Sequence, residues 1–237
     1  MQRSVVMSGI GGQGIVVGTT LLGHAATRNG QFAVHFAQYG GEMRGTKCEC
    51  TLTISDEQVN APPLVSEPDV AIIMHPNPPT RLHGTAAESF QAITSTVRPG
   101  GLAIVNSSLL DLHEVTFRPD IEWLLIPVTD IGKQLGHLMV ASMVAISAFA
   151  AETRMVPVEY IRLALTDVIP AYRHQLLEMD DAGLTAGERL VTAGTEFNAS
   201  RDARGDVQVA AFPDTIEHRT VRIPSTGTYA FRAGVVV

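Results

Sequence analysis

Charged and aromatic side chains are both scarce in this sequence. Among its 237 residues, 17% are charged and 5% are aromatic, while hydrophobic residues make up 45%. The charged share is below the roughly one quarter that is usual for soluble domains. This scarcity indicates that part of the surface is buried against partner chains, because the cores of interfaces are depleted in charge. A compact alanine-rich domain without partners would have the same composition.

The sequence also lacks a run of basic residues and a hydrophobic segment long enough to span a bilayer. Its net charge is −7, which gives no positive surface for a nucleic acid backbone. The longest apolar stretch, residues 138–151, is shorter than the ~20 residues of a transmembrane helix and indicates a buried helix. The first residues lack the pattern of a secretory signal peptide. We therefore expect a cytoplasmic protein that binds neither nucleic acid nor membrane.

Cysteine is rare as well, and the pattern of the two cysteines argues against a metal centre. Cys48 and Cys50 lie in the alternating segment KCECTLTIS, where a strand would direct both thiols to the same face. Two thiols cannot supply the four ligands of a usual iron–sulfur cluster or structural zinc site. We interpret them as small buried residues of a strand. Any cluster chemistry is expected on another chain.

Apolar segments alternate with segments of helical period along the first half of the chain. Strands are predicted at residues 4–10, 31–38, 47–55, 67–75, 101–108 and 122–128, and helices at 14–30 and 80–97. The first two strands and the helix between them should form a parallel strand–helix–strand unit with a right-handed crossover. This alternation is typical of an α/β fold with a doubly wound, Rossmann-like and mostly parallel sheet.

The second half of the chain is predicted to be helical. One helix is expected over residues 130–154 and is apolar on nearly every face, which indicates burial from several sides. A second helix is expected over residues 156–169, with Pro157 near its first turn. Further helix is expected over residues 170–194, with an interruption around Gly183.

The last part of the chain has a different character. Residues 199–237 are rich in β-prone residues, are punctuated by proline and show no helical period. We predict one domain over residues 1–198 and an extended tail over residues 199–237. The tail is expected to pair as a strand with a neighbouring subunit.

A glycine-rich loop follows the first predicted strand, in the segment SGIGGQGIVVG. Gly9, Gly11 and Gly14 satisfy the pattern G-x-G-x-x-G between a strand and a helix. Glycines permit a tight turn and close backbone approach, and the start of a helix offers free N–H groups to an anion. Gly12 removes one more side chain from the loop, and Gln13 adds an amide that can donate to a phosphate or to a neighbouring loop.

One requirement of dinucleotide binding is not met. An acidic residue is expected about 20 positions after the glycines, at the end of the second strand, to hold the ribose. That strand, QFAVHFAQ, contains no carboxylate, and the next acidic residue is Glu42 in the following loop. NAD binding by this chain alone is therefore disfavoured. A structural loop, a different phosphate-bearing ligand and a contact between subunits all remain open.

A second glycine-rich loop, YGGEMRG, follows the second predicted strand. Tyr39 opens the loop, and Arg44 and Gly45 close it. A guanidinium on such a loop is suited to bidentate recognition of carboxylate or phosphate. Both glycine loops should lie at the carboxyl edge of the sheet, because each follows a parallel strand. Alternatively, Arg44 forms an internal ion pair with Glu42 or Asp56.

These loops and the segments after them resemble the gamma subunits of the 2-oxoacid:ferredoxin oxidoreductases. The resemblance is carried by GIGGQG, by QYGGEMRGTKCECTLTISDEQVNAP about 25 residues later, and by PDVAIIM. It covers about residues 3–198, including LGHLMVASMVAISAF and AYRHQLLEMDDAGLTAG. The family includes enzymes for pyruvate, 2-ketoisovalerate, 2-oxoglutarate and phenylglyoxylate. The chain departs from the family pattern at Gly41, Thr46 and His137, so the resemblance does not indicate which 2-oxoacid is used.

The resemblance implies a division of work between subunits. In such enzymes a 2-oxoacid is oxidatively decarboxylated on thiamine diphosphate, electrons leave through iron–sulfur clusters, and coenzyme A receives the acyl group. Thiamine diphosphate, Mg²⁺ and the clusters are expected on companion alpha, beta and delta-type subunits. The electron acceptor is expected to be ferredoxin or an NAD-linked flavoprotein. No catalytic residue and no metal site are expected in this chain, and the chain alone is expected to be inactive.

The resemblance also suggests a use for the two loops, because the gamma subunit is expected near the entrance for coenzyme A. The predicted binding residues are Gly9, Gly11, Gly12, Gln13, Gly14, Tyr39, Arg44 and Gly45. They are expected to contact either the phosphates of coenzyme A or the adjacent subunit. Two other functions remain open. One is a stand-alone dinucleotide-binding dehydrogenase, and the other is a purely scaffolding subunit whose loops bind only protein.

Overall fold

The computed structural model describes most of the first 192 residues and short strands beyond them. The described residues are 2–39, 46–59, 65–76, 86–110, 115–192, 196–198, 200–201, 207–208 and 220–223. Residues 40–45, which include Arg44 and Gly45, lie outside this part. Within it, no helix has the length and apolar character that crossing a bilayer requires.

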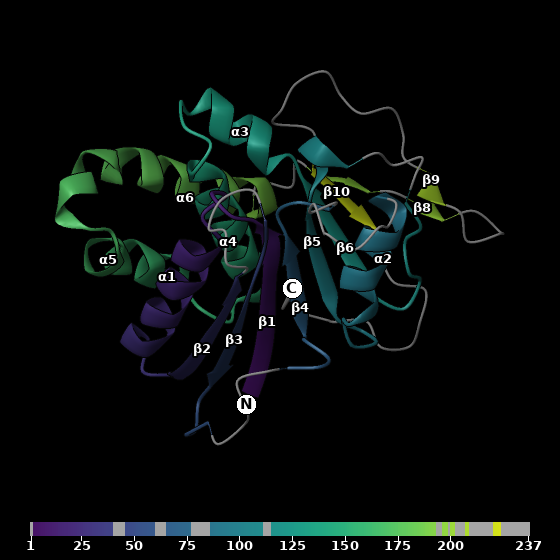
Figure 1. Cartoon of the computed structure of the whole chain (residues 1–237), viewed down its shortest axis with the longest axis horizontal. Coiled ribbons are helices and arrows are strands. Elements are labelled where there is room, and N and C mark those ends of the chain that lie inside the picture. The colour runs from purple at the N-terminus through teal and green to yellow at the C-terminus, as the bar shows by residue number, and fades with distance from the viewer. Residues whose placement is uncertain are drawn as a thin grey trace.

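An eight-stranded mixed sheet runs through the described part of the molecule in the order β2-β3-β1-β4-β5-β6-β10-β7 (Figure 1). The strands are β1 (Gln2–Ile10), β2 (Phe32–Tyr39), β3 (Lys47–Ser55), β4 (Val70–Ile73), β5 (Leu102–Asn106), β6 (Glu122–Ile126), β7 (Glu196–Asn198) and β10 (Thr220–Ile223). Strands β1, β4, β5 and β6 are parallel neighbours. A separate pair is formed by β8 (Ser200–Arg201) and β9 (Val207–Gln208). The predicted α/β fold with a Rossmann-like, mostly parallel sheet is confirmed.

The first strand–helix–strand unit differs in one respect from its simplest form. Strand β2 runs in the same direction as β1, but β3 lies between them and is antiparallel to both. The predicted parallel direction is therefore correct, although β1 and β2 are not neighbours. The alternation in β3 explains its place, because Cys48, Cys50, Leu52 and Ile54 all join the buried cluster beneath α1 (Ile15–Arg28).

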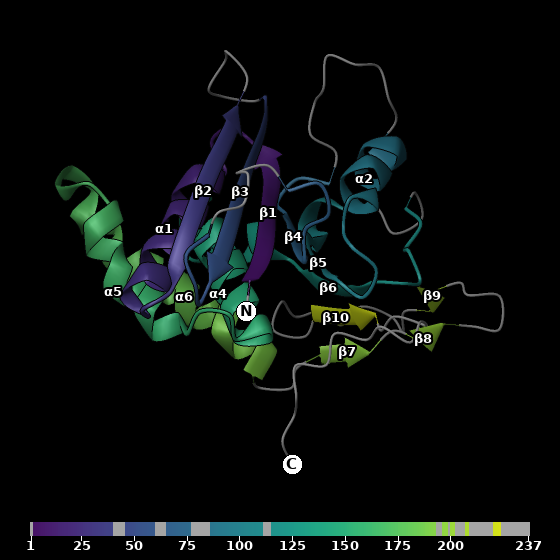
Figure 2. The ribbon, with the colours of Figure 1, turned by 90° about the horizontal axis from the view of Figure 1, so that it is seen from below.

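Helices cover both faces of the sheet, as expected for a doubly wound fold. One face is covered by α1 and α4 (Val140–Thr153), with α5 (Val158–Val168) and α6 (Leu177–Thr192) outside them, and the other by α2 (Ala86–Ser95) (Figures 1 and 2). Successive strand residues alternate between the two cores. Ile72 packs on the α1 and α4 side, whereas Ile73 packs on the α2 side with Trp123.

The single helix expected over residues 130–154 is wrong, because the chain forms two helices there. These are α3 (Val128–Gln134) and α4, and the turn between them contains Gly136 at φ 93°. A positive φ is readily adopted by glycine, and it ends α3. The N–H groups of Gly136 and His137 close the turn by donating to Lys133 and Gly132.

The interruption expected around Gly183 is also wrong, because α6 is continuous through this residue. The break lies earlier, where the 3-10 helix η2 (Ala171–Leu176) leads into α6. Gly183 is needed for packing instead. A Cβ there would lie 2.5 Å from Val140 Cγ1, so its absence lets α6 approach α4 closely. The prediction of Pro157 at the start of α5 is confirmed, since Pro157 is its N-cap.

Part of the C-terminal region belongs to the main sheet. Strand β10 pairs antiparallel with β6 of the same chain, and β7 pairs with β10. For residues 220–223, this corrects the expectation that the tail pairs with a neighbouring subunit. The strand is held by Arg222, whose two terminal nitrogens each donate to Glu152 of α4 at 2.6 Å. The boundary at residue 199 stays a prediction.

Replacing Arg222 with leucine is expected to lower the free energy of unfolding by about 2 kcal/mol. The side chain of Glu152 is only 12% exposed, and the change leaves it without this cation. Arg222 also opposes the rise that burial causes in the pKa of Glu122, so both acidic groups lose a favourable interaction. The control is Arg28→Leu, because Arg28 pairs with Asp167 on the surface and should contribute less than ~1 kcal/mol. Urea unfolding of both variants measures the difference. Equal losses would show that the Arg222 pair does not hold β10.

Candidate functional site at the carboxyl edge of the sheet

The first glycine loop connects β1 to α1 and leaves the start of the helix open. Gly14 is the N-cap residue at φ 78°, and no side chain caps the helix. The first intrahelical bond runs from the N–H of Gly18 to the carbonyl of Gly14 at 2.8 Å, so the amides before Gly18 have no partner within the helix. Gly12, at φ 102°, is exposed, and a Cβ there would meet nothing within 4 Å. This geometry suits an anion.

Gln13 holds the loop together from the inside. Its Oε1 accepts a hydrogen bond from the N–H of Ile10 at 3.0 Å, and its Nε2 donates to the carbonyl of Met74 at 3.3 Å. Gly9 makes room for this amide, because a Cβ at Gly9 would lie 2.6 Å from Gln13 Oε1. The sequence predicts that the Gln13 amide donates to a phosphate or to a neighbouring loop. In the structure it donates to the loop that follows β4.

The two glycine loops begin at the same edge of the sheet, as predicted. Gly9 and Tyr39 both lie opposite Cys48 of β3, one on each side. The N–H of Gly11 donates to the carbonyl of Thr46 at 2.9 Å, which joins the first loop to the end of the second. Tyr39 ends β2 at this edge. The roles of Arg44 and Gly45 lie outside the described residues and stay predictions.

Asn106 ties the ends of the neighbouring parallel strands to the same edge. This residue is 2% exposed, and its Nδ2 donates to the carbonyl of Met74 at 2.8 Å and to Thr129 Oγ1 at 2.7 Å. Its Oδ1 accepts from the N–H of Ser108, at the start of the 3-10 helix η1 (Ser107–Leu109). Through this bond the backbone of Ser108 takes part in the turn that follows β5. The sequence does not predict this structural role of Asn106, because a single asparagine at the end of a strand forms no recognisable motif.

A group formed by His137, Arg173 and Asp180 was also missed, although His137 had been noted as a departure from the family pattern. The first turn of α4 packs against the glycine loop, since a Cβ at Gly14 would lie 2.5 Å from Ser142 Oγ and 3.7 Å from the carbonyl oxygen of Met139. His137 in the turn before α4 and Arg173 in η2 both interact electrostatically with Asp180 of α6. Burial raises the pKa of the Asp180 carboxyl, and Arg173 and His137 oppose that rise. These residues are far apart in the sequence, so no motif indicates that they meet.

The two cysteines are buried residues of β3, as predicted. Both are free thiols and face α1. The hydrogen bond between them lowers the pKa of Cys48 and raises that of Cys50, and burial raises both. His35 of β2 lies 2.9 Å from Thr19 Oγ1 on the same side, and burial lowers the pKa of its imidazole. Within the part of the chain that the structure describes, no group of three potential metal ligands occurs.

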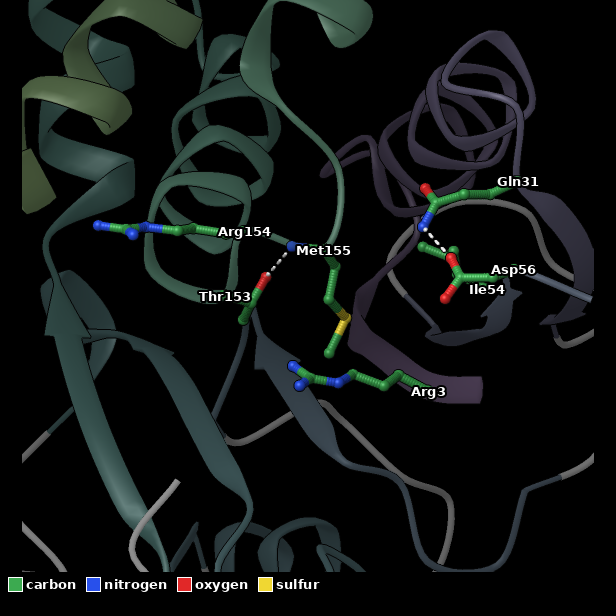
Figure 3. A pocket seen from close by; sticks show the side chains of 7 residues that line it. All are labelled: Arg3, Gln31, Ile54, Asp56, Thr153, Arg154 and Met155. Atoms are coloured by element: carbon green, nitrogen blue, oxygen red, sulfur yellow. Dashed lines mark hydrogen bonds between the residues drawn. The ribbon is translucent and has the colours of Figure 1, made fainter. Parts of the chain in front are cut away.

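A cavity of about 230 Å³ opens at the opposite edge of the sheet (Figure 3). It is lined by Arg3, Gln31, Ile54, Asp56, Thr153, Arg154 and Met155. Gln31 donates to Asp56 at 3.2 Å, and the hydroxyl of Thr153 accepts from the N–H of Met155 at 3.3 Å. Arg3 is the second residue of β1, whereas Gly9 lies near the other end of this strand. None of the predicted binding residues lines this cavity, so the candidate site remains at the carboxyl edge.

The fold and the site together define a class of protein, namely a Rossmann-like domain with a glycine loop at the carboxyl edge of its parallel strands. Residues 4–187 match the family model described as "Pyruvate ferredoxin/flavodoxin oxidoreductase". The chain therefore belongs to this family, and the predicted resemblance to its gamma subunits is confirmed.

Several known proteins are similar to this chain along most of its length. The 2-oxoglutarate synthase subunit KorC of Methanocaldococcus jannaschii is 27% identical over 72% of this chain and 85% of the relative. The pyruvate/ketoisovalerate oxidoreductases common subunit gamma of Thermococcus litoralis is 26% identical over 67% and 82%. The crystal structure of a keto/oxoacid ferredoxin oxidoreductase gamma subunit from Geobacter sulfurreducens has a TM-score of 0.63 at 22% identity. It covers 81% of this chain and 99% of that one, which supports the fold.

Proposed function

We propose that this chain is the gamma subunit of a multisubunit 2-oxoacid:acceptor oxidoreductase and that its glycine loop binds the phosphates of coenzyme A. The complex oxidatively decarboxylates a 2-oxoacid to an acyl-CoA, and two electrons pass to ferredoxin or to an NAD-linked flavoprotein. Thiamine diphosphate, Mg²⁺ and iron–sulfur clusters supply that chemistry on the companion subunits. The role of this chain is to bind coenzyme A, the acyl acceptor, and to help the complex assemble.

The observation that carries this proposal is the uncapped first turn of α1 next to a glycine-rich loop. Gly12 is open to solvent, Gly14 adopts a left-handed conformation, and the first N–H groups of α1 have no side-chain cap and can bind an anion. One residue before the loop, the fully buried hydroxyl of Ser8 has no hydrogen-bond partner in the described part of the chain. Arg44 would add a bidentate cation from the second loop.

The fold argues against a stand-alone dinucleotide-binding dehydrogenase. In such enzymes the strand next to β1 is parallel to it and ends in an acid for the ribose. Here the neighbour on that side is the antiparallel β3, and β2, which has no carboxylate, lies one strand further away. A phosphate-bearing ligand that does not need this acid fits the edge better.

A contact with an adjacent subunit is the second candidate function for the same edge. Val16 in the first turn of α1 is 38% exposed, Leu138 in the turn before α4 is 55% exposed, and Tyr172 in η2 is 77% exposed. Large apolar side chains of this kind are enriched in interfaces. A subunit seated on them would bring its own surface next to the glycine loop.

Gly12→Asp is expected to raise the KM for coenzyme A in the intact complex about tenfold, because the new carboxylate repels the phosphates. The matched control is Gly12→Asn, which has the same size and also tolerates a positive φ but carries no charge. A Cβ at this position meets no protein atom, so the cost of either substitution is the backbone strain at φ 102°, which the two variants share. Steady-state titration of coenzyme A compares them. Equal KM values for the two variants would refute phosphate binding by this loop.

A further inference from the structure

Two basic side chains, His137 of the turn before α4 and Arg173 of η2, contact Met139 close to the glycine loop. Met139, at the end of this turn, has its carbonyl oxygen 3.7 Å from where a Cβ of Gly14 would be. The same Met139 accepts a hydrogen bond at its sulfur from Nη2 of Arg173 at 3.4 Å, and its N–H donates to Nδ1 of His137 at 3.1 Å. Met139 therefore links Arg173 and His137 to the start of α1.

Arg173 is a half-buried cation whose hydrogen-bond partner within the described residues is a thioether. Sulfur of this kind is a weak acceptor. Asp180 interacts with Arg173 electrostatically, but the hydrogen bonds of the described residues include none between them. A guanidinium carries five N–H donors in a planar fork, so most of this fork is available to an anion.

One ring nitrogen of His137 accepts a hydrogen bond from the backbone, and the other can donate one. Because Nδ1 accepts the N–H of Met139, the neutral ring carries its proton on Nε2. His137 is exposed, so this donor can reach a ligand. The carboxyl group of Asp180, a residue that is 6% exposed, interacts electrostatically with both basic side chains. The three side chains come from the turn, from η2 and from α6, and they meet only in the folded chain.

We propose that Arg173 and His137 bind the 3′-phosphate of coenzyme A while the glycine loop binds the diphosphate. This inference rests on the proposed function. The two kinds of phosphate call for different partners. A diphosphate is well matched by backbone N–H groups at the start of a helix. A phosphomonoester carries close to two negative charges and is matched by a guanidinium fork together with a further N–H donor, here Nε2 of His137.

The test compares coenzyme A with 3′-dephospho-coenzyme A as substrates of the intact complex. The wild-type complex should prefer coenzyme A by roughly tenfold to a hundredfold in KM, which is the range for one or two charge-assisted hydrogen bonds. In Arg173→Gln the KM for coenzyme A should rise until this preference falls below about threefold. Arg173→Lys should recover part of the preference, because it restores the charge without the fork. His137→Gln should reduce it by a smaller factor.

The control is Lys133→Gln on α3. Lys133 is a surface cation paired with Asp130, so this variant lowers the net charge equally and should keep the wild-type preference. A wild-type complex without preference, or an Arg173→Gln complex that keeps it, would overturn the inference. Gly12→Asp tests the proposed function separately from the 3′-phosphate site, because it should raise the KM for coenzyme A and for its 3′-dephospho form alike. If it does so while Arg173→Gln changes nothing, only the 3′-phosphate site is wrong.

Discussion

Gly187→Ala is expected to lower the free energy of unfolding by about 3 kcal/mol, although alanine is the better helix former. Gly187 lies where α6 crosses α4, and an added Cβ would collide with the carbonyl oxygen of Val144 and with Ser147 Oγ. Neither helix can yield easily. Most of α4 is buried, and Ser147 Oγ already donates to the carbonyl of Leu184 at 2.6 Å. Urea or thermal unfolding of the purified chain measures the loss.

The matched control is Gly23→Ala in α1. Gly23 is also a buried helical glycine, but its added Cβ would lie 3.5 Å from Leu52 Cδ1, which is an ordinary contact. This change should stabilise the chain by about 0.5–1 kcal/mol, since glycine is a poor residue inside a helix. Opposite signs at the two positions are the expected pattern. A neutral or stabilising Gly187→Ala would show that the two helices have room to separate.

The same helix pair has a consequence for the candidate site. Helix α4 begins at the turn that packs against Gly14, and α6 carries Asp180 to the basic side chains of that turn. Separating α6 from α4 would therefore displace Arg173 and His137 relative to the glycine loop. In the assembled complex we expect Gly187→Ala to weaken discrimination between coenzyme A and its 3′-dephospho form as well.

The strands and their edge could be predicted from the sequence because they follow from local patterns. The glycines from Gly9 to Gly14 lie between an apolar strand and a helical period, and the alternation around Cys48 and Cys50 indicates which face is buried. Both features depend on residues that are close in sequence. The place of β3 between β1 and β2 does not follow from such patterns, because it depends on which strand pairs with which.

Glycine was the main source of error in the helical half. Gly183 looked like an interruption, yet its missing side chain serves the contact with Val140. Gly136 looked like part of a long buried helix, yet it ends α3 at φ 93°. The same residue type ends one helix and lets another pack closely. Only the neighbouring helix decides between these roles, and that helix is distant in sequence.

Only half of the candidate site was visible in the sequence for a related reason. The glycine loops form continuous motifs, whereas His137, Arg173 and Asp180 meet through the packing of separate segments, and Asn106 bonds to Met74 and Thr129 from a different strand. Their residue types are ordinary, and their spacing matches no motif. His137 alone attracted attention, because it departs from the pattern of the resembling family. Such sites are found by asking which charged groups have weak partners after folding.

Asn106→Ala is expected to lower the free energy of unfolding by about 3 kcal/mol. The change removes the donors to the Met74 carbonyl and to Thr129 Oγ1 and the acceptor for the N–H of Ser108, and it leaves the buried Met74 carbonyl with the bond from Gln13 alone. The control is Asn29→Ala, whose amide donates to Gln31 in a more exposed position and should cost less than ~1 kcal/mol. Chemical unfolding of the two variants checks the difference, and similar losses would contradict a structural role for Asn106.

The expected effect of Asn106→Ala extends to the binding loop through one atom. The carbonyl oxygen of Met74 accepts from both Asn106 and Gln13, so these two amides together hold the loop after β4 against the glycine loop. Without Asn106, the bond from Gln13 at 3.3 Å is the longer and weaker of the pair and has to hold alone. We therefore expect the KM for coenzyme A to rise about threefold to tenfold in the complex, where assembly compensates part of the lost stability. A variant that is destabilised but keeps the wild-type KM would show that the two loops are positioned independently.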